Sequence, residues 1–190
     1  MQPARLDLPV VPGTTYRDTV RLMQPEFVYP PITAIAAGTS GVRLTVDHDL
    51  ESDWPVWVRG VTGMIELNRD PRTALPWRAK RIDAVTLEIN ALSGAGQRPA
   101  GGELVYKLPV DLFGAAVAMR FTRAGQEVLT LTIGGGLASP APGTITRELT
   151  PAQTELLSNS WQYTLDVTFS DGTVTRYYQG GPQQECHHGC

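Results

Sequence analysis

The chain has 190 residues, with 16 Lys and Arg against 19 Asp and Glu, so its formal net charge is -3 at pH 7. This length suits one large domain or two small ones, and the weakly acidic balance gives no electrostatic attraction for a nucleic acid. No stretch approaches the roughly 18 consecutive apolar residues of a membrane span, and the first residues lack the apolar core of a signal peptide. We therefore expect a soluble protein, made in a cytoplasm, that neither binds nucleic acid nor spans a membrane.

The 19 Gly and 15 Pro residues favour turns between short strands over long helices. The first predicted strand covers residues 16–22, where apolar and polar residues alternate and Asp18 is the one polar residue on the apolar face. The proline-spaced run 25–31 follows. Because adjacent prolines fix φ and lack a donor, we interpret this run as a connector outside any sheet and as a domain boundary.

Residues 32–105 show the pattern of a compact all-β unit. The segments 32–37 and 42–46 form a predicted hairpin around a Gly-Thr-Ser-Gly turn, and further strands are expected at 54–61 and 85–89. A glycine-rich stretch from Ser93 to Gly102 closes this part of the chain.

The last third of the chain has the most regular alternation. It predicts strands at 115–121, 127–133, 143–149, 161–169 and 174–178. The turns Arg123–Gln126 and Asp171-Gly172 each join two of them as a hairpin. Thr150, Pro151 and Gln153 occupy the N-cap, first and third positions of a short helix with a capping box. The fold class is therefore all-β with one short helix.

Several of these segments resemble the immunoglobulin-like N-terminal domain of phage baseplate upper proteins. The resemblance rests on Pro109–Gly114, Leu149–Thr154, and Tyr163–Val167 followed by Asp171-Gly172-Thr173. In that family, a segment like Gly13–Leu22 is followed almost directly by the turn that corresponds to Pro109–Gly114 here. Here about eighty residues intervene, which indicates an insertion.

The intervening part is similar to a small β module of tail fibre and tail tip proteins, named after the first catalytic cysteine half-domain of ubiquitin-activating enzymes. The matching segments are Ile32–Ile35, His48–Leu50, Trp57–Asn68 and Val85–Ile89. Together the two resemblances imply an immunoglobulin-like sandwich at 1–31 and 106–182, an inserted small β-barrel-like module at 32–105, and a Cys/His tail at 183–190.

The function implied by the resemblance is a non-enzymatic structural component of a phage tail tip or baseplate. Such a virion protein is made in the host bacterial cytoplasm, docks on the tail hub or distal tail ring in multiple copies as a symmetric ring, and contacts neighbouring tail or fibre proteins. The alternative is a carbohydrate- or host-receptor-binding module of a tail fibre, in which exposed Trp54 or Trp77 stacks on a sugar.

An enzyme is the third alternative, and no catalytic residue emerges for it. No Gly-x-Ser-x-Gly motif occurs, and Gly134–Gly136 is not followed by the Lys-Ser/Thr of a phosphate-binding loop. His48 lies among Asp47, Asp49 and other acids that would raise its pKa, which gives a conceivable zinc or calcium ligand. With no second ligand cluster, we interpret this stretch as a polar loop between strands.

The end of the chain carries the only concentrated metal ligands. Cys186, His187, His188 and Cys190 supply four thiolate and imidazole donors, the types preferred by zinc and iron-sulfur centres. Because so short a segment is poorly suited to wrap one tetrahedral ion, a site shared between subunits is sterically easier. A Cys186–Cys190 disulfide and a disordered tail remain as alternatives.

Four aromatic residues are the predicted interface with neighbouring proteins. Phe27 and Tyr29 lie between prolines, and Tyr177 and Tyr178 lie near the end of the chain, so one small domain does not easily bury them. Trp57, Trp161 and Tyr163 fall on alternating apolar faces and are expected in the core.

Overall fold

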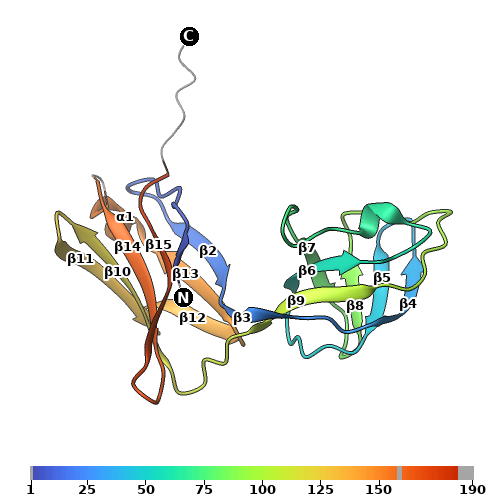
Figure 1. Ribbon diagram of the computed structural model, residues 1–190. Helices are drawn as coiled ribbons and strands as arrows, with labels where there is room; N and C mark the ends of the chain where they lie inside the picture. The colour runs from blue at the N-terminus through green and yellow to red at the C-terminus, as the bar shows by residue number, and fades with distance from the viewer. Residues whose placement is uncertain (1, 158–159, 184–190) are drawn as a thin grey trace, which may run out of the picture. The chain divides into compact units, whose positions relative to one another are not determined.

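The computed structural model describes residues 2–157 and 160–183 and divides the chain into two compact units (Figure 1). Unit 1 combines the residues up to Leu22 with those from Asp111 onward, and unit 2 is the intervening segment Met23–Val110. Both consist almost entirely of strands, and each sheet curls on itself. The all-β, sandwich-like fold class with one short α-helix is therefore confirmed.

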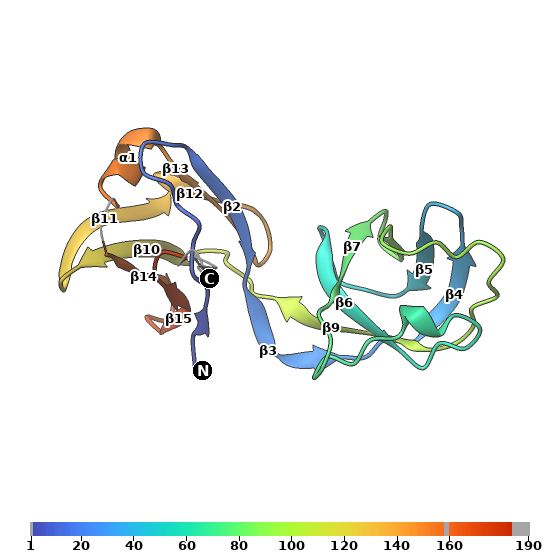
Figure 2. The same ribbon diagram turned by 90° about the horizontal axis from the view of Figure 1, so that it is seen from above.

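Unit 1 is an eight-stranded sheet that curls around its own core (Figure 2). Its strands, in sheet order, are β1 (Ala4–Arg5), β15 (Val174–Gly180), β14 (Gln162–Thr168), β10 (Ala116–Arg123), β11 (Gln126–Ile133), β12 (Gly136–Ala141), β13 (Thr144–Leu149) and β2 (Tyr16–Arg21). Alternate residues of β10 and β14 are buried on the inner face. There the ring of Phe121 lies 5.6 Å from Trp161 and 5.9 Å from Tyr163, as expected for aromatic packing in a core.

A parallel pairing joins the two ends of unit 1. β1 lies beside β15, and the N–H groups of Leu6 and Leu8 donate to the carbonyls of Gln179 and Gly181, each at 2.9 Å. Leu8 is buried, and the Tyr163 hydroxyl donates to the Leu6 carbonyl at 2.7 Å. Residues Ala4–Leu8 therefore form an edge of the sheet.

The predicted helix is present as α1 (Pro151–Glu155), and its start is confirmed in detail. The Thr150 hydroxyl accepts from the Gln153 N–H at 3.3 Å, and the Gln153 side chain accepts from the Thr150 N–H at 2.9 Å. These are the two bonds of a capping box. In the described part of the chain, no helix is long and apolar enough to cross a membrane.

Asp18, the polar exception on the apolar face of β2, has a partner inside unit 1. The side chain of Arg147 in β13 is fully buried and donates through Nη2 to Asp18 Oδ2. The Tyr16 hydroxyl donates to the same carboxylate oxygen at 3.0 Å. A buried charge is tolerated only when it is paired, so this ion pair explains why the alternation of β2 includes an acid.

Unit 2 is a seven-stranded sheet. Its strands, in sheet order, are β3 (Met23–Val28), β9 (Glu103–Pro109), β6 (Trp54–Arg59), β7 (Trp77–Arg81), β8 (Thr86–Ile89), β5 (Val42–Val46) and β4 (Ile32–Ala37), with one 3-10 turn, η1 (Ile65–Leu67). The Ile32 N–H donates to Gly102 O at 3.0 Å, and the Leu104 N–H donates to Pro30 O at 2.9 Å. These bonds bring the start of β4 back to β9, so the sheet curls around its core.

The first part of the proline-spaced run, up to Val28, is a strand, which corrects its interpretation as a connector outside any sheet. The adjacent prolines Pro30 and Pro31 follow the strand. Residues Met23–Val28 form β3 at the edge of the sheet and pair with β9. Pro25 lies where the register between Met23 and Phe27 is irregular, a place where a missing N–H is tolerated. Because β3 belongs to unit 2, the units divide after Leu22 and after Val110, and not after residues 31 and 105 as predicted from the sequence.

Candidate functional site

The outer face of β3, β9 and β6 in unit 2 carries a cluster of aromatic and basic side chains, which we call the aromatic surface. It consists of Phe27, Tyr29, Trp57, Arg59 and Lys107. The register places Phe27 opposite Lys107, and Arg59 opposite Glu103. Three neighbouring strands therefore bring these side chains to one face, since residues paired across strands share a face.

The rings and cations of the aromatic surface are in direct contact. The Phe27 and Trp57 rings meet edge to face with centroids 5.7 Å apart, and the Phe27 and Tyr29 centroids are 6.4 Å apart. Lys107 Nζ lies 4.9 Å from the Phe27 centroid, and Arg59 Cζ lies 5.1 Å from that of Tyr29. These distances fall within the range of cation-π attraction.

Hydrogen bonds hold two of these side chains in place. Arg59 Nε donates to Glu103 Oε1 at 2.9 Å, and Trp57 Nε1 donates to the carbonyl of Ala74 at 2.7 Å. Val105, opposite Trp57 in β9, is fully buried although it lies on the outer side of the strand. Tyr29 remains 49% exposed. The surface is therefore a cluster of aromatic and basic side chains, two of them fixed by hydrogen bonds, that keeps aromatic area open to solvent.

The structure separates the four predicted interface residues. Phe27 and Tyr29 share the aromatic surface of unit 2, whereas Tyr177 and Tyr178 lie in β15 of unit 1 and are partly buried. The Tyr178 hydroxyl donates to the carbonyl of Arg21 at 2.8 Å. Trp57, expected in the core, is instead partly exposed. In β6, Trp57 alternates with the same set of residues as Pro55 and Arg59, and this position was the sequence signal that its side chain lies on the outer face.

The two tryptophans proposed to stack on a sugar are buried, which corrects that expectation. Trp54 is 1% exposed and Trp77 is 5% exposed, and both lie in the core of unit 2. Their indole N–H groups donate to the carbonyls of Lys107 and Leu67 at 2.8 and 2.9 Å. Neither ring offers a face to a sugar.

His48 is also buried, so burial and not the neighbouring acids determines its protonation. Burial lowers the pKa of His48 below its ordinary value of about 6.5, and the positive charge of Arg81 lowers it further, against smaller opposing effects of the Thr86 backbone, Asp83 and Asp47. Its Nδ1 accepts from the Leu50 N–H at 3.3 Å. The flanking acid Asp47 does raise this pKa, as expected, but burial and Arg81 outweigh it, so the pKa is lowered overall.

The pKa of His48 makes the stability of unit 2 pH-dependent. An unfolded chain protonates His48 near pH 6.5, while the folded chain protonates it only at a lower pH, so the free energy of unfolding falls as the pH drops below about 6.5. Urea denaturation at pH 7.5 and 5.5, followed by fluorescence in a Trp161→Phe background, reports on unit 2 because the other three tryptophans belong to it. His48→Asn keeps an acceptor for Leu50 and removes the titrating group, so it should flatten the difference. An equal decrease in the free energy of unfolding between pH 7.5 and 5.5, with and without His48→Asn, would contradict the assignment of this pH dependence to His48.

The predicted metal ligands Cys186, His187, His188 and Cys190 lie outside the described residues. Within residues 2–157 and 160–183, no three His, Cys, Asp or Glu side chains gather closely enough to hold a metal ion. That range includes His48 and the acids around it.

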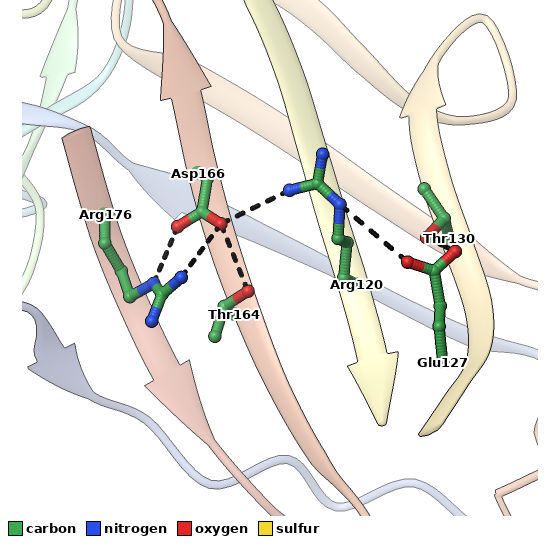
Figure 3. Close-up of polar contacts among 6 residues, drawn as sticks. All are labelled: Arg120, Glu127, Thr130, Thr164, Asp166 and Arg176. Atoms are coloured by element: carbon green, nitrogen blue, oxygen red, sulfur yellow. Dashed lines mark hydrogen bonds and ion pairs between the residues drawn. The ribbon is translucent and has the colours of Figure 1, made fainter. Parts of the chain in front are cut away.

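The outer face of unit 1 carries a network of charged side chains that the sequence did not indicate (Figure 3). Asp166 of β14 is 8% exposed in its side chain and accepts from Arg176 Nε at 2.8 Å and Nη2 at 3.3 Å. Arg120 Nη1 and Thr164 Oγ1 donate to Asp166 Oδ2 at 3.4 and 3.3 Å. Arg120 Nε also lies 3.9 Å from Glu127. Alternating charges on four adjacent strands thus neutralise one another.

A groove of about 680 Å³ adjoins this network on unit 1. Its lining includes Arg5, Asp7, Gln162, Thr164, Arg176 and Gln179, so it is bordered by β1, β15 and β14. A second groove of about 760 Å³ lies over β12, β13 and β2 beside Gly134–Gly136 and is lined mainly by apolar surface. Of the two, the first brings together the larger number of hydrogen-bonding side chains.

Comparisons of the chain with protein-family models, with curated proteins and with solved structures find no match.

Proposed function

We propose that the chain is a non-enzymatic structural adaptor that binds neighbouring proteins through the aromatic surface of unit 2. In this proposal, the chain acts as a virion protein in a phage tail tip or baseplate, where several copies surround the tail axis. The neighbours are the tail hub or distal tail ring on one side and further tail or fibre proteins on the other.

The aromatic surface is the observation that carries the protein-binding part of the proposal. Tryptophan, tyrosine and arginine are enriched among the residues that contribute most to protein interfaces, and Trp57, Tyr29 and Arg59 lie within one cluster here. The bonds to Ala74 and Glu103 already fix Trp57 and Arg59. Binding therefore costs little side-chain entropy, which favours affinity.

The assignment to a phage tail is supported by the sequence resemblance. The stretch Leu149–Thr154 lies in unit 1, and the stretch Pro109–Gly114 runs from the last two residues of unit 2 into unit 1. The segments similar to the tail fibre module lie in unit 2, which interrupts unit 1 in the sequence. An interrupted sandwich with an inserted module is the organisation that the two resemblances together imply.

Labelling of purified particles tests the proposal. Phage particles produced from the genome that encodes this chain would be examined by mass spectrometry and by immunogold labelling with an antibody to it. We expect the chain in the particles with gold at the tail end. Absence of the chain from particles, or gold on the capsid alone, would overturn the assignment to a tail.

Variants of the aromatic surface test which face docks. Tyr29→Ala and Trp57→Ala should reduce the amount of chain per particle at least several-fold, because each removes an aromatic contact of the interface. Phe113→Ala is the matched control, since Phe113 in unit 1 is 94% exposed and lies outside the surface. Equal incorporation of all three variants would show that the aromatic surface is not the docking face.

A further inference from the structure

The groove bordered by β1, β15 and β14 holds hydrogen-bonding side chains that unit 1 does not use for itself. Gln162 and Gln179 are exposed, line the groove, and make no side-chain hydrogen bond within the described residues. The register aligns Gln179 with Arg5 on one side and with Thr164 on the other. These polar side chains therefore lie next to one another on the outer face of adjacent strands.

The charges around the groove are already neutralised. Arg5 Nη2 lies 3.3 Å from Asp7 Oδ2, and Arg176 Nε lies 2.8 Å from Asp166 Oδ1. The pKa of Asp7 is held below its usual value chiefly by the Gly181 N–H, so this carboxylate is ionised at neutral pH. Two cations face two anions, and a charged ligand gains no net attraction in this site.

The charged network around Asp166, which adjoins the groove, fixes the guanidinium of Arg176. Arg176 is bound by two hydrogen bonds to Asp166, and Asp166 is held from the other side by Arg120 and Thr164 (Figure 3). Glycines at 180 and 181 add no side chain to the groove, and the N–H of Gly181 positions Asp7. The groove is thus open, and the Arg176 guanidinium at its rim is held in place before a ligand arrives, which lowers the cost of binding to that side chain.

We propose that this groove of unit 1 binds a neutral oligosaccharide. A sugar hydroxyl both donates and accepts, as do the carboxamides of Gln162 and Gln179, so neighbouring hydroxyls of one sugar ring match this rim. The volume of about 680 Å³ lies within the range of about 300–1,000 Å³ typical of small-ligand sites. This inference is independent of the proposed docking role, since the aromatic surface belongs to the other unit.

Binding of the full-length chain to an array of neutral di- to tetrasaccharides tests the inference. The array would carry glucose, galactose, mannose and N-acetylglucosamine units, with sialylated and phosphorylated glycans for comparison, and positive spots would be followed by calorimetric titration. We expect binding to a subset of the neutral glycans. Absence of binding to every neutral glycan, or a preference for the charged ones, would overturn the inference.

Matched variants place the binding in the groove. Gln162→Ala and Gln179→Ala should each weaken the titrated affinity about three- to tenfold, the effect of losing one hydrogen bond. Gln126→Ala, an exposed glutamine at the start of β11 outside the groove, should leave the affinity unchanged, as should Tyr29→Ala. Glycan binding that survives both groove variants would show that the sugar binds elsewhere. Loss with Tyr29→Ala alone would assign it to the aromatic surface.

Discussion

Replacing Asp18 with alanine is expected to lower the free energy of unfolding of unit 1 by about 3 kcal/mol, because it leaves a buried guanidinium without a counter-charge. The side chain of Arg147 is fully buried, and its Nε and Nη1 atoms have no hydrogen-bond partner in the described part of the chain. Removing one partner of a buried pair costs about 3–5 kcal/mol. The lower end applies because Asp18 itself is 37% exposed.

The reverse substitution provides the control. Arg147→Met removes the buried charge and leaves Asp18 with access to water and with the Tyr16 hydroxyl as a donor. It should therefore cost much less than Asp18→Ala, and the double variant Asp18→Asn/Arg147→Met should approach the original stability, since apolar replacements of buried pairs are often neutral.

Urea-dependent hydrogen exchange of β13 and β14, followed by mass spectrometry, measures this ordering within unit 1. Equal losses in the free energy of unfolding for Asp18→Ala and Arg147→Met would contradict this ordering. They would mean that the Arg147 guanidinium is stabilised as much by its other surroundings as by the Asp18 carboxylate.

The pKa of Asp18 supports the same ion pair. Burial raises the pKa of Asp18, but the charge and hydrogen bond of Arg147 outweigh it and hold this pKa below its ordinary value. The ion pair should therefore persist at neutral pH.

Replacing Trp54 with alanine is expected to destabilise unit 2 by about 3–5 kcal/mol, the usual cost of removing a large aromatic side chain from a core. Trp54 is 1% exposed, and its indole N–H donates to the carbonyl of Lys107 at 2.8 Å. Because Lys107 belongs to the aromatic surface, this variant should also loosen β9 beneath that surface. Urea denaturation followed by the fluorescence of the two remaining tryptophans, Trp57 and Trp77, in a Trp161→Phe background measures the loss.

Trp57→Ala is the comparison that separates stability from docking. Trp57 is partly exposed on the outer face of the same strand, so its replacement should cost about 1 kcal/mol, within the range of most single substitutions. Trp54→Phe keeps most of the ring volume and loses the N–H, so it should destabilise unit 2 less than Trp54→Ala and more than Trp57→Ala. Equal destabilisation by Trp54→Ala and Trp57→Ala would place Trp57 in the core, as the sequence pattern alone suggested.

Local patterns in the sequence were sufficient to predict most strands and the helix start. Alternation of apolar residues is a direct record of which face of a strand is buried, so β10, β11 and β14 could be located without the structure. Thr150 and Gln153 form their capping bonds within one helical turn, and for that reason the pattern of residue types alone identified them.

The functional surfaces depend on contacts between residues far apart in the chain. Asp166 meets Arg120 from 46 residues away, and Phe27 meets Lys107 only because β3 pairs with β9. The parallel pairing of β1 with β15, which borders the proposed saccharide groove, joins the two ends of unit 1 and leaves no local signal.

The sequence by itself determined that alternate residues of a strand lie on opposite faces, because that depends only on the two-residue period of an extended chain. The tertiary structure alone decided that Trp54 is buried and Trp57 partly exposed, that Asp18 has a buried partner, and that polar side chains of β1, β15 and β14 border one groove. Those properties depend on which strands become neighbours, and strand order is set by the packing of the whole unit.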